Sequence, residues 1–226
     1  MIVVSRGVIF RAWSLVCLLA GGVVASCASV DRPADPTHEQ STRPAGKLEP
    51  LGSNQELEAL YTADQAERAP GTAPGDWSVV AKHDRERQER VRELLDAGAV
   101  RSGRDYFHAA MVYQHADGAD GVQLAHELAM IGACLGDEPS RWLAAASYDR
   151  LLMNLERPQR FATQYRSDSD GVLKLYTTSD GVTDAMRAAL NVPSLRTAME
   201  RVKQVQEQLD ELGKSMKAPT GEKPGH

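Results

Sequence analysis

The sequence predicts a mainly α-helical domain, with about six helices packed antiparallel and one small β-hairpin. Of the 226 residues, 42% are hydrophobic but only 5% are aromatic, so the core must rest mainly on aliphatic side chains. Between residues 76 and 212, apolar positions recur at the three- and four-residue spacing of amphipathic helices. One stretch departs from that spacing, because short aromatic and β-branched runs flank a polar turn there, as in a hairpin.

The first predicted helix begins at Trp77, where Asp76 can cap it, and Gly98 is a suitable stop. Charges of both signs alternate over residues 82–93, in the middle of this helix. Such alternation is typical of a helix face that solvent covers. We therefore expect this charged stretch to lie at the surface.

The second predicted helix begins at a capping box formed by Ser102 and Asp105, and it ends at His115. The Gly- and Asp-rich run 116–121 predicts a loop, and a third helix follows over residues 122–135. The remaining predicted elements are a fourth helix from residue 137 to about 153, hairpin strands within 161–166 and 172–178, a helix over 180–190 and a last helix over 194–212.

The third helix carries Leu128, Ile131 and Leu135 on one apolar face, and Cys134 lies in the same stretch. Cys134 has no cysteine partner once Cys17 and Cys27 are assigned to the N-terminal segment discussed below. A cysteine in an apolar helix usually behaves as a small hydrophobic residue. We therefore expect Cys134 to be buried.

Composition and motifs exclude several classes of function. The net charge is −5 and no basic stripe is present, which argues against nucleic-acid binding because phosphate neutralisation needs clustered Lys and Arg. His126 and Glu127 begin like a zinc-protease motif, but Met130 stands where the second histidine is needed. The chain also has no glycine-rich phosphate loop and no cysteine pair for a zinc site. We expect no metal and no cofactor.

The N-terminal segment has the features of a secretory signal. Arg6 and Arg11 precede an uncharged run that is too short to span a membrane, and small residues follow it. The end of the run, Val24-Ala25-Ser26-Cys27, resembles the lipobox of bacterial lipoproteins. An ordinary cleaved signal with an incidental cysteine is the alternative.

The lipobox resemblance implies a lipid anchor. Cys27 would receive a diacylglyceryl group, the chain would be cleaved after Ser26, and the new amine would be acylated, for example by palmitate. Two or more acyl chains give stable attachment to a membrane. We therefore expect a lipoprotein of the bacterial cell envelope that faces the periplasm, at the outer rather than the inner membrane because Ala28 is not the retaining Asp.

This interpretation divides the chain into four parts. Residues 1–26 are the signal peptide, and residues 27–75 are the lipidated cysteine and a Pro-rich tether that cannot bury enough apolar surface to order. A brief helical patch over residues 54–68 is expected to dock only weakly. The helical domain covers 76–212, and residues 213–226 are expected to form a disordered tail.

A polar set remains that the helical pattern does not explain. It comprises the pair Gln114-His115, the pair Asp149-Arg150 on the apolar face of the fourth helix, and the run from Gln159 to Gln164. In order and spacing, these elements resemble a bacterial domain-of-unknown-function family with Gln-His, Asp-Arg and Q-x-[YF]-G-T-Q motifs. The resemblance covers roughly residues 76–195 and implies a shared fold but no activity. Ala162 stands where the family has Gly.

Two interpretations of this set stay open. In the structural one, Asp149 is buried and pairs with Arg150 or Arg160, while His115 caps its helix as a cation. In the functional one, a pocket binds a polar ligand and is lined by His115, Asp149, Arg150, Gln159 and Gln164.

The same residues lead to two function classes. The first is a lipid-anchored helical binding module whose partner is an envelope protein, a peptide or a small polar ligand. The alternative is an envelope hydrolase in which Asp149 orients His115 as a general base. An internally satisfied polar network would favour the module, and a deep polar pocket would favour the enzyme. The sequence leaves open whether the protein is an enzyme.

Overall fold

The computed structural model describes residues 52–69, 77–168 and 172–217. Several predictions concern residues outside these ranges. They are the signal peptide, lipidation at Cys27, the tether up to residue 51, the cap at Asp76, the hairpin turn at 169–171 and the tail beyond residue 217.

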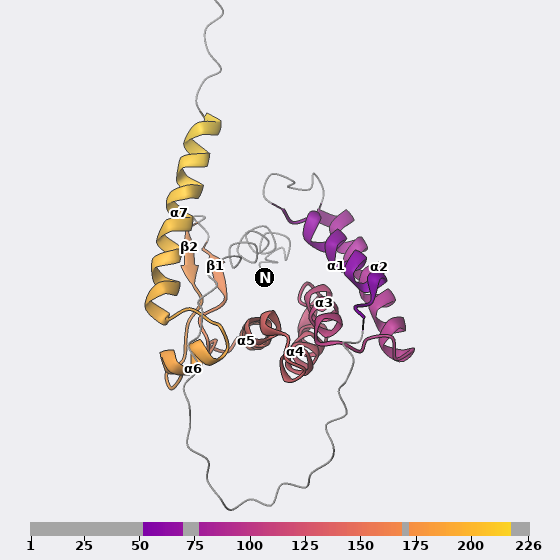
Figure 1. The fold of residues 1–226 in the computed structure, drawn as a ribbon. Helices are drawn as coiled ribbons and strands as arrows, with labels where there is room; N and C mark the ends of the chain where they lie inside the picture. The colour runs from indigo at the N-terminus through magenta and orange to yellow at the C-terminus, as the bar shows by residue number, and fades with distance from the viewer. Residues whose placement is uncertain (1–51, 70–76, 169–171, 218–226) are drawn as a thin grey trace, which may run out of the picture.

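Within the described residues the chain forms seven helices and one two-stranded sheet, so the prediction of a mainly α fold is confirmed (Figure 1). No helix in these ranges is long and apolar enough to cross a membrane. The elements are α1 (Gln55–Ala66), α2 (Trp77–Asp96), α3 (Gly103–Tyr113), α4 (Gly118–Cys134), α5 (Glu138–Asn154), β1 (Tyr165–Ser167), β2 (Leu173–Leu175), α6 (Asp184–Ala189) and α7 (Leu195–Lys217).

Helices α3, α4 and α5 pack antiparallel in succession, because the start of α3, the end of α4 and the start of α5 meet. A Cβ atom on Gly132 of α4 would lie 2.4 Å from Ser140 Oγ and 3.0 Å from the carbonyl oxygen of Gly103. Only glycine fits at this crossing without a shift of the backbone. The Ser102–Asp105 capping box predicted for α3 is present, and Asp137 caps α5.

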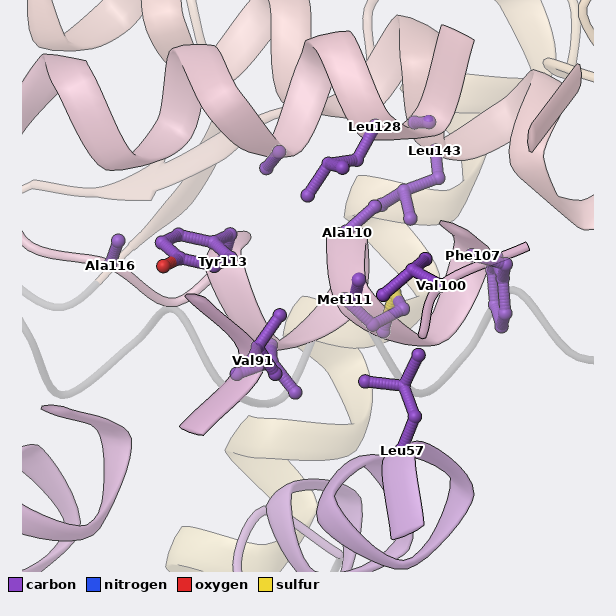
Figure 2. Packing of buried hydrophobic residues seen from close by; sticks show 14 of the residues in the cluster. Leu57, Val91, Val100, Phe107, Ala110, Met111, Tyr113, Ala116, Leu128 and Leu143 are labelled. Atoms are coloured by element: carbon purple, nitrogen blue, oxygen red, sulfur yellow. The ribbon is translucent and has the colours of Figure 1, made fainter. Parts of the chain in front are cut away.

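The hydrophobic core lies where five helices meet (Figure 2). Leu57 of α1, Val91 of α2, Met111 of α3, Leu128 of α4 and Leu143 of α5 all belong to it. Burying one such side chain contributes roughly 1.5–3 kcal/mol. Alanines of α3, α4 and α5 fill the space between the larger side chains, which lets these helices approach closely.

Helix α1 is a packed part of this core, although the sequence predicted a weakly docked patch within the tether. Leu57 is 0% exposed, and Asn54 caps the helix by accepting from the Leu57 N–H. Asp105 of α3 holds the same end, accepting from the Asn54 N–H at 2.7 Å and the Ser53 hydroxyl at 3.2 Å. The residues that hold α1 in place lie in the distant segment 91–113, and a pattern of local composition cannot reveal such contacts. The packed helices therefore begin before residue 76, the predicted start of the domain.

Several element boundaries also differ from the prediction. Helix α6 begins at Asp184 and not at residue 180, and the two strands are shorter than the runs 161–166 and 172–178. Helix α4 begins at Gly118, inside the run 116–121 that was predicted to be a loop. Helix α7 continues to Lys217, past the predicted start of the tail at residue 213. In both places Gly residues suggested a break, but the amphipathic pattern and the packing of the rest of the helix extend the helix through them.

Burial differs from the prediction on two helices. Asp84 and Arg87 of α2 are buried, so the charged stretch is not uniformly solvated. Cys134, Ile131 and Leu135 are exposed rather than buried. The buried face of α4 carries Val122, Ala125, Leu128, Ala129 and Gly132, and this orientation of the helix leaves Ile131, Cys134 and Leu135 at the surface.

The predicted hairpin is present, with Tyr165 of β1 opposite Leu175 of β2 in antiparallel register. Helix α7 packs on β2, and the Gln206 side chain accepts a 2.7 Å hydrogen bond from the Leu173 N–H. Helix α5 lies between α1–α4 on one side and the hairpin with α6 and α7 on the other (Figure 1). The loop that joins α5 to β1, residues 156–164, therefore connects the two halves of the molecule; we call it the α5–β1 loop.

Candidate functional site

The predicted site residues fall into two polar clusters. We define the Asp64 cluster by its position at the junction of α1, α2 and α3; it contains Asp64, Glu67, Arg68, His83, Asp84, Arg87 and His115. We define the Asp149 cluster as Asp149 on α5 with its partners in the α5–β1 loop, Gln159, Arg160, Phe161, Thr163 and Gln164. His115 and Asp149 thus belong to different hydrogen-bond networks.

Asp149 is 0% exposed and holds the α5–β1 loop. Its carboxylate accepts from the backbone N–H groups of Arg160 at 2.6 Å, Phe161 at 3.0 Å and Thr163 at 3.1 Å. The Thr163 hydroxyl donates a fourth bond at 2.8 Å. The predicted burial of Asp149 is therefore seen, but its partners are backbone groups of the loop and not an arginine guanidinium.

Two opposing effects act on the pKa of Asp149. Burial disfavours the charged form and raises the pKa above the ordinary value for Asp, while the N–H and hydroxyl donors of the loop lower it. Burial has the larger effect. The carboxylate faces the loop and not solvent, so Asp149 holds the loop in place.

Ala162 lies within the loop that Asp149 holds, and it has a left-handed conformation with φ of 65°. The conformation lets the N–H groups on both sides of Ala162 point to the same carboxylate. A residue with a Cβ atom is strained there by roughly 1–2 kcal/mol. Glycine adopts this conformation without strain, so Ala162 is a position at which glycine would be favoured.

Gln159 and Gln164 complete the loop. Gln159 donates to the carbonyl oxygens of Gln164 at 3.0 Å and Tyr176 at 2.8 Å, and its Oε1 accepts from the Gln164 N–H at 2.8 Å. The Gln164 side chain donates to the Ala146 carbonyl on α5 at 3.0 Å. Both amides therefore satisfy backbone groups of irregular chain, as the structural interpretation predicted.

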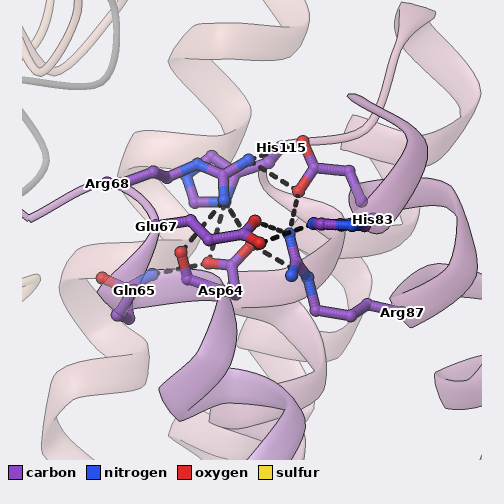
Figure 3. A network of polar contacts seen from close by, with 8 residues as sticks. Asp64, Gln65, Glu67, Arg68, His83, Arg87 and His115 are labelled. Carbon is purple, nitrogen blue, oxygen red and sulfur yellow. Dashed lines mark hydrogen bonds and ion pairs between the residues drawn. The ribbon is translucent and has the colours of Figure 1, made fainter. Parts of the chain in front are cut away.

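His115 joins the Asp64 cluster (Figure 3). Its Nδ1 lies 3.1 Å from the Asp64 carboxylate, and its side chain is 7% exposed. Asp64 also accepts from Arg68 Nη1 at 2.9 Å, while the second terminal nitrogen of Arg68 reaches Asp84 at 2.6 Å. The imidazole thus pins the end of α3 to α1.

The Asp64 cluster favours the ionised carboxylate. Burial alone would raise the pKa of Asp64, but His115, Arg68 and Arg87 outweigh burial and hold the pKa below its usual value. Glu67 at the edge of the cluster accepts from Arg87 at 2.9 Å and lies 2.6 Å from His83 Nδ1. Charges of both signs therefore alternate across the junction of α1 with α2.

Two further members of the predicted polar set are buried. Arg150 is on α5 beside Asp149, and it is 8% exposed. Gln114 forms the C-cap of α3, and its side-chain amide makes no hydrogen bond with any described residue.

The geometry does not assemble the catalytic pair that the hydrolase alternative requires. The four donors to Asp149 all come from residues 160–163, so this carboxylate does not orient the His115 imidazole. His115 is paired with Asp64, and its Nε2 is buried. A general base must reach the proton that it removes, directly or through one water. Among the described residues, no group of three or more His, Cys, Asp or Glu could hold a metal ion.

Sequence reasoning missed most of the Asp64 cluster, because it placed Asp64, Glu67 and Arg68 in the tether and the α2 charges in solvent. One local signal was available. Asp64 and Arg68 are four residues apart, the spacing of an ion pair on one helix face. The cross-helix partners Arg87 and His115 had no such signal.

Comparisons of the chain with family models, with curated proteins and with solved structures found no match. The function of the protein is therefore inferred from the two clusters and from the sequence of the N-terminal segment.

Proposed function

We propose that this protein is a lipid-anchored protein of the bacterial envelope whose helical domain acts by binding a partner. The observation that carries the binding part is the hydrogen bonding of Asp149. Its carboxylate is fully engaged by the loop that it holds, and His115 is buried against Asp64. Asp149 and His115, the two residues that the hydrolase alternative would use, thus both make hydrogen bonds that hold the fold together.

The anchoring part rests on the N-terminal sequence. The lipobox-like run Val24-Ala25-Ser26-Cys27 supports lipidation of Cys27 and attachment to the periplasmic face of a membrane, with the outer membrane preferred. The partner is an envelope protein, a peptide or a small polar ligand.

The end of α4 is the surface on which we would test protein binding. Met130, Ile131 and Leu135 are 49%, 42% and 55% exposed, and exposed Cys134 lies among them. Grouped apolar side chains at a surface are typical of interaction sites.

The experiment places a photoreactive amino acid at Ile131 of the full chain in bacterial cells. Glu89 is the matched control, because it is an exposed helical residue of α2 outside the apolar group. We expect one discrete cross-linked product from Ile131, none from Glu89, and loss of both the product and membrane attachment in Cys27→Ala. Equal products from both positions, or an unmodified Cys27 thiol in the mature wild-type protein, would contradict the proposal.

A further inference from the structure

Gln114, at the end of α3, has a side-chain amide that is both buried and unpaired. The residue is 1% exposed, and neither Nε2 nor Oε1 makes a hydrogen bond with any residue in the described part of the chain. Within those ranges, Gln114 is the one residue in which both side-chain polar atoms are buried in this state. An amide carries two N–H donors and an oxygen that accepts up to two hydrogen bonds. The described chain therefore leaves the whole capacity of this amide unused.

An amide in this state needs a partner. In the unfolded chain the amide is hydrogen-bonded to solvent, and burial without a replacement partner loses those bonds. Buried polar side-chain atoms in folded proteins are for this reason paired with protein groups or with ordered water in the large majority of cases. The amide of Gln114 accordingly points to a bound molecule beside it.

The surroundings of Gln114 limit what that molecule can be. Ala110 lies four residues earlier on the same side of α3, and it belongs to the hydrophobic core together with Leu143 of α5. A partner at this depth must fit into a closely packed interior, which rules out a ligand of any size. An ion would need an opposite charge to offset its burial, and a neutral amide does not supply one.

We propose that the Gln114 amide binds at least one internal water molecule. Folded proteins contain roughly one buried water per 27 residues, and each makes about three hydrogen bonds to groups that otherwise lack partners. The Gln114 Nε2 donates to this water. Further acceptors are available in the same turn, because an α-helix ends with carbonyl groups that have no partner within the helix.

This assignment separates the roles of two neighbouring residues. His115 contacts α1 through Asp64, whereas Gln114 holds water on the inner side of the same turn. The chain thus leaves α3 through a turn with a protein partner for one side chain and a solvent partner for the other. This inference goes beyond the proposed function, and it depends neither on the lipid anchor nor on the surface of α4.

The test uses the full chain in detergent, with ¹⁵N-labelled glutamine side chains. Rotating-frame NOE spectra distinguish a nearby water from proton exchange with water, because the two give cross-peaks of opposite sign. We expect the Gln114 amide protons to show an NOE to water with the sign of a molecule that is held by the protein. Gln204, an exposed glutamine of α7, is the matched control and should show only the weak signal of surface hydration.

Gln114→Met tests the same site by stability, because it keeps the length of the side chain and removes both polar atoms. We expect a lower urea midpoint, since the internal water and the backbone groups that it bonds lose a partner. Gln204→Met should keep the wild-type midpoint. Gln114→Asn retains an amide but removes the labelled glutamine signal, so it assigns the Gln114 resonance even if Gln114→Met does not fold.

Three results would overturn the inference. One is a Gln114 amide whose signal with water is no stronger than that of Gln204. Another is a higher urea midpoint for Gln114→Met than for wild type, which is the result for an amide that has no partner at all. The third is a set of strong NOEs from the Gln114 amide protons to residues outside 52–69, 77–168 and 172–217, which would make the partner a part of the chain and not water.

Discussion

The Asp149 carboxylate supplies the acceptors that the α5–β1 loop lacks, because this loop has no regular secondary structure at residues 160–164. Three backbone N–H groups and one hydroxyl converge on it. Burying a carboxylate is costly, and the four charge-assisted hydrogen bonds offset part of that cost. A single side chain thereby fixes the path by which the chain leaves α5 for the hairpin.

The strain at Ala162 gives a prediction at this scale. Ala162→Gly should raise the free energy of unfolding by roughly 0.5–1 kcal/mol, because relief of the left-handed strain exceeds the entropy that glycine loses on folding. Ala144→Gly within α5 is the control, and it should lower stability by about 1 kcal/mol, as glycine does inside a helix. Urea unfolding measures both. A loss of stability in Ala162→Gly would show that the methyl group is worth more than the strain.

At the scale of elements, α1 is attached by an apolar middle and two polar ends. Leu57→Ala should lower the free energy of unfolding by about 2–4 kcal/mol, because Leu57 is fully buried and leaves a cavity. Leu135→Ala on α4 is the matched control, and it should change stability by less than about 0.5 kcal/mol since Leu135 is 55% exposed. Equal effects of the two substitutions in thermal or urea melts would mean that α1 is not part of the core.

The polar ends of α1 make its attachment sensitive to acid. The pKa of Asp64 and the pKa of Asp105 both lie below the ordinary value for Asp. Burial alone would raise each pKa, but the cations around Asp64 and the N–H donors around Asp105 lower it by more than burial raises it. Each carboxylate therefore contributes stability that is complete above the unfolded-state pKa, about 3.9, and is lost as pH falls through the folded-state value.

We accordingly expect the free energy of unfolding to stay nearly constant from about pH 7 to about pH 5 and to fall below about pH 4. Asp64→Asn should reduce stability at neutral pH and flatten the acid loss. Glu56→Gln, at the exposed pair with Arg90, should change the acid loss much less than Asp64→Asn, because solvent screens an exposed pair. Urea melts across pH check these outcomes, and an unaltered acid loss in Asp64→Asn would contradict the role of this cluster.

Local sequence signals predicted some elements of this fold but not how those elements pack. The helix caps at Ser102 and Asp137 and the hairpin were predictable, since their signals are local. The packing of α1 was not, because Leu57 and Asp64 meet partners more than thirty residues away. For the same reason, the burial of Asp149 could be predicted from its place on an apolar face, but its loop partners could not.

At the scale of the whole molecule, the two polar clusters sit at the joints between packed parts. The Asp64 cluster joins α1 to α2 and α3, and the Asp149 cluster joins the helices to the hairpin half. Residues that resemble a family motif therefore hold the architecture together. We propose that the exposed apolar end of α4, and not the motif residues themselves, binds the partner.

The most direct test of this account is the stability of Asp149→Ala, measured by urea unfolding of the full chain. The substitution leaves three backbone N–H groups of the loop without their acceptor, so we expect the free energy of unfolding to fall by about 3 kcal/mol or more. Asp96→Ala, at an exposed position, is the control and should change it by no more than about 0.5 kcal/mol. A value for Asp149→Ala within about 1 kcal/mol of wild type would contradict the structural role and return Asp149 to the candidates for an active site.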